Sequence, residues 1–327
     1  MLSFDSIAEA CARLKGRHVV TPLLEYEPLN EMSGGRVLFK AENLQKTGSF
    51  KFRGAFNKIA SLDPAARRRG VVTYSSGNHA QGVAAAAKAF GVPATVVMPQ
   101  DAPALKRKNT ERLGATVVLY DRRTGDRKAI AEKIGAETGA VIVPPYDDEM
   151  IIAGQGTIGI ELSRQLDEAS IAADLLLCPV GGGGLIAGIS TALRTLMPHM
   201  RIYCVEPAGF DDTRRSLEER RRVANAPDAS SICDAIVTAM PGEVTFPINL
   251  ANLAGGFAVG DGDVARAVDA LFEIAKLVVE PGGAVGLAAL LGRRLELDGR
   301  TAVVVLSGGN VDIAAFRSRF GVKSDMI

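Results

Sequence analysis

Short apolar runs alternate along the chain with longer segments in which apolar residues recur at helical spacing. The runs are rich in Val, Ile and Leu, which is typical of strands buried on both faces. Strands that alternate with helices predict an α/β protein with open, mainly parallel, twisted sheets. The strands are too many for one small sheet, so we expect two domains. The predicted strands span residues 37–39, 71–74, 94–98, 116–120, 141–143, 175–180, 201–205 and 302–306.

Helical patterns fill the intervals between these strands. The first spans residues 5–14 and has Asp5 or Ser6 as its predicted N-cap. A charged run at residues 214–222 (RRSLEERRR) predicts a solvated helix or loop. The other predicted helices span residues 52–60, 80–89, 104–113, 127–138, 158–166, 185–196, 264–278 and 285–291.

The composition is that of a globular protein. Of 327 residues, 47% are hydrophobic and 23% are charged, which is ample for a buried core. The formal net charge of +1 gives no support to a nucleic-acid or membrane partner. The four cysteines have no CxxC spacing, so neither a zinc site nor a disulfide framework is predicted. No signal peptide or membrane span is visible, and a cytoplasmic location is expected.

One turn places a lysine in an unusual position. Lys51 lies in the sequence KTGSFKFRG, which follows the strand at 37–39 and opens the helix at 52–60. A helix N-terminus disfavours a protonated amine, and the flanking Phe50 and Phe52 are expected to desolvate it, which lowers a lysine pKa. Such an amine suits Schiff-base or proton-transfer chemistry. The alternative is an ordinary surface lysine.

A second turn, SSGNH at residues 75–79, follows the strand at 71–74 and opens a helix. Short polar side chains and free backbone N–H groups at a helix start bind anions such as a carboxylate. The alternative is a plain N-cap with a turn glycine.

The tetraglycine Gly181–Gly184 joins the strand at 175–180 to the next helix and predicts a nest of N–H donors for a phosphate. It also satisfies the dinucleotide pattern GxGxxA, with Glu206 at the end of the next strand. The glycines alone therefore leave open an NAD-dependent dehydrogenase.

Two polar clusters end strands in the second half of the chain. The carboxylates of Glu206, Asp211 and Asp212 lie close together in VEPAGFDD and suit a hard cation such as magnesium or calcium. The alternative is a surface turn. Ser307, in LSGGN, lies at the carboxyl end of the last strand, the usual position for ligands in open α/β sheets.

The order of these motifs resembles the fold-type II pyridoxal-phosphate (PLP) enzymes, specifically the threonine/serine ammonia-lyase (dehydratase) and serine racemase family. The resemblance runs over nearly the whole chain, from Thr21 to Ser307, and AENLQKTGSFKFRGA is its most specific motif. It implies the tryptophan synthase beta-like fold, with a large PLP-binding domain (1–69 and 148–327) and a small inserted α/β domain (70–147). It also implies an amino-acid substrate and a homodimer, and it makes the dehydrogenase a remote alternative.

The resemblance implies roles for individual residues. Lys51 would hold the cofactor through a Schiff base and carry the α-proton of the substrate. The implied cofactor-binding residues are Phe50 against the pyridine ring, Asn78 at the phenolic oxygen, Gly181, Gly182, Gly183 and Gly184 at the phosphate, and Ser307 at the ring nitrogen. The implied substrate-binding residues are Thr47, Ser75, Ser76, Asn78 and His79. The implied ligands of a divalent cation (Mg, Ca or Mn) are Glu206, the carbonyl of Phe210 and Asp212.

The expected reaction converts L-threonine, L-serine or a related β-hydroxy amino acid into a 2-oxo acid and ammonia. Ser76 departs from simple threonine dehydratases, which often have alanine there, and resembles the racemases and hydroxyaspartate ammonia-lyases of the family. We therefore treat it as a candidate second catalytic residue, with 3-hydroxyaspartate ammonia-lyase or a serine/aspartate-type racemase as alternatives. Arg127 is a candidate for binding a second carboxylate, or else a solvated arginine. Because the sequence ends near Ile327, we expect no regulatory domain like that of the biosynthetic threonine dehydratases, and we expect a catabolic or housekeeping role.

Overall fold

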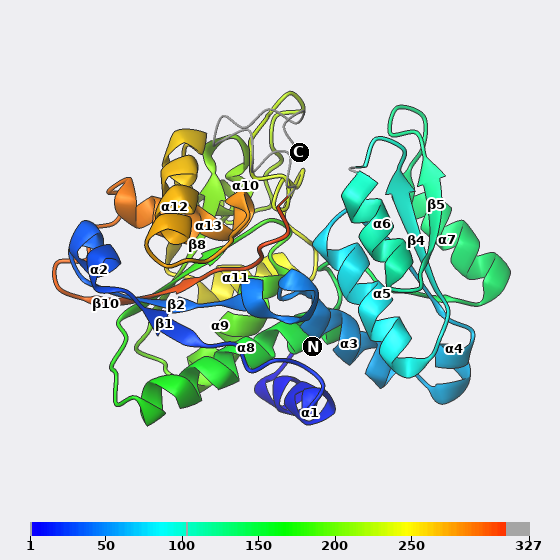
Figure 1. Cartoon of the computed structure of the whole chain (residues 1–327), viewed down its shortest axis with the longest axis horizontal. Helices are drawn as coiled ribbons and strands as arrows, with labels where there is room; N and C mark the ends of the chain where they lie inside the picture. Colours follow the sequence, from blue (N-terminus) through cyan, green and yellow to red (C-terminus); the bar gives the residue numbers. More distant parts are fainter. Residues whose placement is uncertain (1, 103, 312–327) are drawn as a thin grey trace.

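Two open sheets organise the chain, and a computed structural model describes residues 2–102 and 104–311 (Figure 1). The six-stranded sheet has the order β1-β2-β10-β7-β8-β9 and is parallel except for β1. The four-stranded sheet has the order β5-β4-β3-β6 and is parallel throughout. These sheets confirm the predicted α/β class. The strands are β1 Leu23–Glu25, β2 Arg36–Lys40, β3 Val71–Tyr74, β4 Ala94–Pro99, β5 Thr116–Tyr120, β6 Val141–Ile142, β7 Leu175–Pro179, β8 Arg201–Pro207, β9 Gly255–Val259 and β10 Thr301–Val305.

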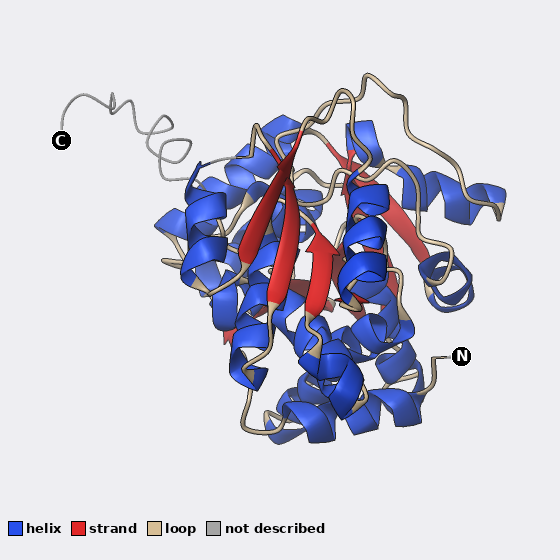
Figure 2. Cartoon of the chain, turned by 90° about the vertical axis from the view of Figure 1, so that its right-hand side faces the viewer, coloured by secondary structure: helices blue, strands red, loops and turns tan. Residues whose placement is uncertain are grey.

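Helices lie on both sides of the strands (Figure 2). They are α1 Phe4–Leu14, α2 Glu27–Ser33, α3 Lys51–Ser61, α4 Pro64–Arg68, α5 Asn78–Phe90, α6 Ala104–Arg112, α7 Arg127–Thr138, α8 Glu149–Glu168, α9 Gly184–Leu196, α10 Asp212–Glu219, α11 Thr245–Asn252, α12 Asp261–Glu273 and α13 Pro281–Leu291. Single 3₁₀ turns occur at η1 Glu42–Leu44, η2 Lys46–Gly48 and η3 Ala208–Phe210.

Several predicted boundaries need correction. The N-cap of α1 is Ser3, whose side chain accepts a hydrogen bond from the backbone N–H of Ser6, and not Asp5 or Ser6. The helix predicted at 264–278 ends earlier, as α12, at Glu273, and the charged run at 214–222 contributes most of α10. The sequence patterns did not predict β1, β9, α2, α4 or α11, because these elements are short or, in β9, begin with two glycines.

The largest correction concerns α8. The predicted helix at 158–166 is only the second half of this 20-residue helix, because glycines interrupt the apolar pattern of its first half. These glycines let helices approach closely. A Cβ on Gly154 would lie 2.6 Å from the Cα of Gly54 in α3, and one on Gly156 would lie 2.9 Å from the carbonyl oxygen of Gly188 in α9. The glycines that weaken the helical pattern are therefore required for the packing of α8 between α3 and α9.

Helix α3 joins the two sheets. Its residues Phe52, Phe56 and Ile59 pack in one apolar cluster with strands β3 and β4 of the smaller sheet. Helix α3 also packs against α8, and α8 packs on α9, which contacts β7 of the larger sheet. The domain limits at residues 69/70 and 147/148 remain a prediction. The two sheets nevertheless draw their strands from residues 23–40 with 175–305 and from residues 71–142, respectively.

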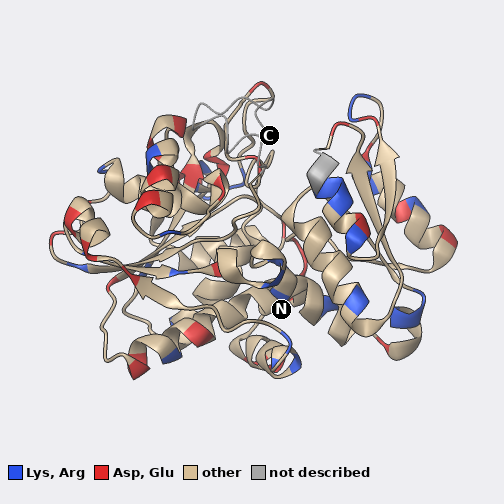
Figure 3. Ribbon diagram, in the orientation of Figure 1, with Lys and Arg blue, Asp and Glu red and all other residues tan. Residues whose placement is uncertain are grey.

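Charged residues are spread over the helices and loops of both halves, and the strands contain few of them (Figure 3). Basic and acidic positions are interspersed along the ribbon, in keeping with the net charge of +1. Among the helices described, none has the length and apolar character that a membrane span requires.

Candidate active site

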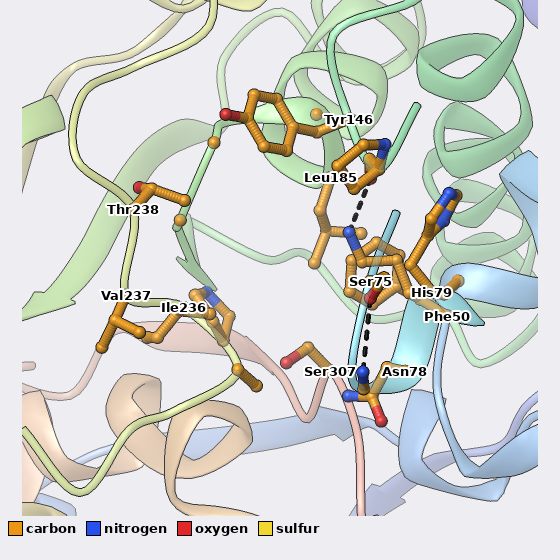
Figure 4. Close-up of a pocket in the computed structure, with 18 of the residues that line it drawn as sticks. Phe50, Ser75, Asn78, His79, Tyr146, Leu185, Ile236, Val237, Thr238 and Ser307 are labelled. Carbon is orange, nitrogen blue, oxygen red and sulfur yellow. Dashed lines mark hydrogen bonds between the residues drawn. The ribbon is translucent and has the colours of Figure 1, made fainter. Parts of the chain in front are cut away.

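A pocket of about 170 Å³ lies where the carboxyl ends of both sheets meet. Its walls come from the turn before α3, the start of α5, the glycine loop before α9, the end of β10 and the loop at residues 234–238 (Figure 4). The following sequence-predicted residues line this pocket: Phe50, Lys51, Ser75, Ser76, Asn78, His79, Arg127, Gly181, Gly182, Gly183, Gly184 and Ser307. Thr47, Glu206, Phe210 and Asp212 do not line it.

Lys51 is the first residue of α3 and its amine faces the pocket. The Nζ atom donates a hydrogen bond of 2.7 Å to the carbonyl oxygen of Pro145 and lies 5.1 Å from the ring centroid of Phe50. Burial lowers the pKa of Lys51 to about 8, although the carboxylate of Glu280 acts in the opposite direction. The amine is therefore available in its neutral, nucleophilic form much closer to physiological pH than an ordinary lysine.

The SGGN segment after β10 holds the turn that precedes Lys51. The backbone N–H of Phe50 donates to the carbonyl oxygen of Ser307 (3.2 Å), and that of Gly309 donates to Gly48 (2.9 Å). The side chain of Asn310 donates to the carbonyl oxygen of Thr47 (2.7 Å), whose φ of 64° is unusual for a β-branched residue. Two motifs at opposite ends of the sequence thus form one structural unit that positions the lysine.

Asn78 begins α5 and has two side-chain partners. Its Nδ2 donates to Oε1 of Glu280 (2.6 Å), and its Oδ1 accepts from Nδ2 of Asn310 (2.8 Å). Glu280 is 2% exposed and lines the pocket beside Lys51. Burial raises the pKa of Glu280 to about 7, and the hydrogen bond from Asn78 opposes this shift.

The sequence patterns missed Glu280. The pair Glu280-Pro281 before an apolar run could have predicted a helix start at this point. Proline is favoured in the first turn of a helix, and the residue before it takes the N-cap position.

His79 is neutral. Its Nε2 lies 3.0 Å from the carbonyl oxygen of Val143, so this nitrogen carries the proton, and its buried Nδ1 has no partner among the described residues. Burial lowers the pKa of His79 to about 3, and the charge of Lys51 acts in the same direction. The side chain consequently has no donor left for a substrate carboxylate. Any such contact must use the backbone N–H groups at the start of α5, which lack intrahelical acceptors.

The glycine loop fits an anion. Gly183, with φ of +90°, caps α9, and a Cβ there would lie 2.6 Å from Nδ2 of Asn249. A side chain on Gly182 would collide with the ring of Tyr146, which also lines the pocket. Only glycines leave the backbone N–H groups of this loop uncovered at the N-terminus of a 13-residue helix.

Basic side chains of the smaller sheet's layer reach the pocket mouth. Arg127 begins α7, and its guanidinium lies 5.8 Å from the ring centroid of Tyr74. Lys106 in α6 forms an ion pair of 2.6 Å with Asp234, which lies in the loop at residues 234–238. Arg127 is exposed to solvent and also lines the pocket.

The acidic cluster lies apart from the pocket. Glu206 accepts hydrogen bonds from the backbone N–H groups of Thr213 (3.0 Å) and Arg214 (2.8 Å). Asp212 is buried, and its Oδ2 has no hydrogen-bond partner within the described ranges. Over the same residues, no group of three or more His, Cys, Asp and Glu side chains is arranged to hold a metal.

These features define a class of protein: an α/β protein that has a buried amine of lowered pKa and a glycine loop suited to an anion in the same pocket. The family model of pyridoxal-phosphate dependent enzymes matches residues 14–308. The chain therefore belongs to this family, and the match decides the question that the glycine loop left open in favour of PLP over NAD.

Individual relatives agree with this assignment. L-threonine ammonia-lyase of Thermotoga maritima is 42% identical over 96% of this chain and 77% of its own length. L-threo-3-hydroxyaspartate ammonia-lyase of Saccharomyces cerevisiae is 40% identical over 99% of this chain and 98% of its own. The structure of maize serine racemase matches with a TM-score of 0.92 at 36% identity, over 98% of this chain and 97% of that one.

Proposed function

We propose that the protein is a PLP-dependent ammonia-lyase that converts a β-hydroxy amino acid, with L-threonine and L-serine as first candidates, into a 2-oxo acid and ammonia. The observation that carries this proposal is the amine of Lys51 in the same pocket as the glycine nest. The ammonia-lyases of T. maritima and S. cerevisiae among the relatives support it.

The chain's residues have distinct parts in this reaction. PLP, when bound, supplies the electron sink for the electrons of the Cα–H bond. Lys51 would hold it covalently and then accept the α-proton at Nζ, which its lowered pKa favours. Gly181, Gly182, Gly183 and Gly184 would bind its phosphate, Ser307 its ring nitrogen, Asn78 its phenolic oxygen, and Phe50 would lie against its ring. Ser75, Ser76 and the first N–H groups of α5 would bind the substrate carboxylate.

The test is Lys51→Ala, with Lys46→Ala in the same turn as the control. Lys46 is exposed and donates to the carbonyl oxygen of Arg17, outside the pocket. After borohydride reduction, we expect cofactor to be covalently attached to the wild type and to Lys46→Ala but not to Lys51→Ala, which also loses turnover. Covalent attachment in reduced Lys51→Ala would end the assignment.

A second candidate substrate is 3-hydroxyaspartate, and the observation that favours it is Arg127 at the pocket mouth. A guanidinium binds a carboxylate through two parallel hydrogen bonds. Arg127→Gln should therefore raise KM for 3-hydroxyaspartate at least tenfold, about 1.4 kcal/mol, and leave L-serine turnover nearly unchanged. Arg123→Gln is the control, because Arg123 is 88% exposed and pairs with Asp121. Equal losses on both substrates would exclude this role.

Ser76 is proposed as the acid/base that acts from the side opposite to Lys51. If it has this role, Ser76→Ala abolishes racemisation or elimination of D-substrates and retains much of the elimination of L-substrates. Equal losses on both enantiomeric series, with no racemisation by the wild type, would reject the second-base role and leave carboxylate binding.

A divalent cation is proposed at Glu206 and Asp212, with the carbonyl of Phe210 as a further ligand. Support comes from the buried carboxylates of Glu206, in β8, and Asp212, at the start of α10, and from Oδ2 of Asp212, which has no hydrogen-bond partner among the described residues. Added magnesium should raise Tm and a chelator should lower it, because binding to the folded state alone stabilises that state. If Tm and the turnover rate are unchanged in both conditions, the cluster binds no cation and is only a structural turn.

A cytoplasmic homodimer completes the proposal. Exposed apolar side chains of Val19, Val20, Leu44 and Val278 support self-association. Three segments carry them, and hydrogen bonds from Gln45 to Val19 and from Asn43 to Val278 tie these segments together. One chain has a mass of 34.4 kDa, and analytical ultracentrifugation should give twice this mass. Val20→Glu, at the most exposed of the four positions, should shift it to the monomer.

A further inference from the structure

The amide of Asn78 is held in one orientation by a chain of hydrogen bonds. The chain begins at the carbonyl oxygen of Thr47, which can only accept, so the group of Asn310 that faces it must be Nδ2. The same Nδ2 donates to Asn78, so the atom of Asn78 that faces Asn310 must be Oδ1. The NH₂ group of Asn78 then points to Glu280, whose Oε1 accepts from it at 2.6 Å.

This arrangement leaves one N–H of Asn78 unused. An amide NH₂ has two donors, and within residues 2–102 and 104–311 the Nδ2 of Asn78 donates only to Glu280. Asn78 lines the pocket together with Ser307 and Lys51. The second N–H is therefore available to an acceptor oxygen of a bound group.

The position of Glu280 is itself tightly determined. Its backbone N–H donates to the carbonyl oxygen of Gly308 (3.0 Å), and any side chain at Gly308 would collide with the Glu280 carboxylate. Its side chain is buried, which disfavours an ionised carboxylate unless it is hydrogen-bonded or near a cation. The charged groups that act on it are Asp234, Lys106 and Lys51. Burial of the Glu280 carboxylate costs folding free energy, which indicates a functional role for this side chain in the pocket.

We propose that Glu280 and Asn310 are positioning residues that fix the amide of Asn78, so that its second N–H meets the phenolic oxygen of the bound cofactor. Neither side chain is assigned a contact with substrate. The inference rests on the proposed function, because the pocket must hold PLP for the oxygen to be present. It explains why the SGGN segment extends to an asparagine after the serine and both glycines.

The experiment compares visible absorption spectra and cofactor dissociation constants of purified holoenzymes. Asn310→Asp is nearly isosteric but replaces the donor by an acceptor that repels both the Thr47 carbonyl and Oδ1 of Asn78. We expect it to shift the absorption band of the bound cofactor as Asn78→Ala does and to weaken cofactor binding about tenfold, or ~1.4 kcal/mol. The double variant should be no worse than Asn78→Ala alone, since both act through one amide.

A second pair of variants tests Glu280. Glu280→Gln keeps an acceptor oxygen for Asn78 and should retain the wild-type spectrum, whereas Glu280→Met removes the acceptor and should shift the band. The control is Asn43→Asp, because Asn43 is 7% exposed and donates to the Val278 carbonyl (3.2 Å) without contacting Asn78. It should lower stability and leave the spectrum unchanged.

The outcomes separate this inference from the proposed function. A shift in Asn78→Ala together with wild-type spectra in Asn310→Asp and Glu280→Met, or additive losses in the double variant, would overturn the positioning role alone. A wild-type protein that binds no PLP, or an Asn78→Ala protein with an unaltered spectrum and affinity, would overturn both.

Discussion

Lys51 and Arg53 lie two residues apart on α3, and their surroundings shift their pKa values in opposite directions. Arg53 is fully buried and forms ion pairs with Glu42 (2.8 Å) and Glu161 (2.6 Å). Burial alone would lower its pKa, but the two carboxylates raise it above the ordinary value. Lys51 forms no ion pair with any described carboxylate, and burial lowers its pKa to about 8.

The difference shows how one helix can serve structure and chemistry together. A buried cation with complete partners is locked in its charged form. A buried cation without them shifts toward the neutral form that a nucleophile or base requires. Glu161 also contacts Lys40 and His18, so the cluster anchors α3 to α8 on the side away from the pocket. The anchored helix then presents Lys51 to the cavity.

The largest expected effect comes from Arg53→Met. Removal of one member of a buried ion network leaves uncompensated charges and costs about 3–5 kcal/mol of unfolding free energy. Urea denaturation of the cofactor-free protein measures it. Arg36→Met is the control, because the Arg36–Glu25 pair is exposed and should contribute about 0–1 kcal/mol. If the two variants lose the same amount, the buried network does not anchor α3.

The sequence predicted the chemistry of this helix better than its anchoring. Lys51, the SSGNH turn and the tetraglycine each follow a strand directly, so a short local pattern was enough to identify them. One partner of Arg53, Glu42 in η1, lies only 11 residues before it, whereas the other, Glu161 in α8, lies 108 residues after it. No local pattern joins Arg53 to Glu161, because only the packing of α3 on α8 brings these two side chains together.

The same reason explains what was missed in the fold and the site. Buried strands such as β4, β7 and β10 were predicted because they are continuous apolar runs, whereas the glycines of β9 and α8 obscured both elements. Tyr146, Asp234 and Glu280 reach the pocket from three separate segments that carry no motif. Their presence follows from topology, which sequence patterns describe only in outline.

The second prediction is that Lys51→Met stabilises the folded protein, whereas Arg53→Met destabilises it. In the cofactor-free protein at pH 7, Lys51 is protonated in both states, but its charge is disfavoured in the folded one. A pKa of about 8 against an ordinary 10.5 corresponds to a penalty of up to about 3 kcal/mol. Lys51→Met should therefore raise the unfolding free energy by up to this amount at pH 7, and by about 2 kcal/mol at pH 9, where the folded amine is already neutral.

Urea denaturation at both pH values measures this gain. A variant less stable than the wild type at pH 7, or a gain that grows with pH, would mean that the amine is well solvated or paired. The contrast with Arg53→Met makes this comparison informative, since the same substitution two residues further along the helix should have the opposite effect.

The smallest expected effect concerns His79, which like Lys51 is buried and forms no ion pair with a described carboxylate. Its pKa of about 3 lies well below the ordinary 6.5, so the unfolded chain takes up a proton at this residue before the folded protein does. The stabilisation is complete above pH 6.5 and is lost as pH falls, by about 2 kcal/mol at pH 5.

His79→Gln can keep a donor to the Val143 carbonyl and does not titrate. Between pH 7 and pH 5, its unfolding free energy should therefore fall by about 2 kcal/mol less than that of the wild type. His199→Gln, at an exposed position, is the control for the substitution itself. Parallel curves for His79→Gln and the wild type would show that His79 accepts a proton inside the folded protein, and that the pocket wall is far more polar than its burial indicates.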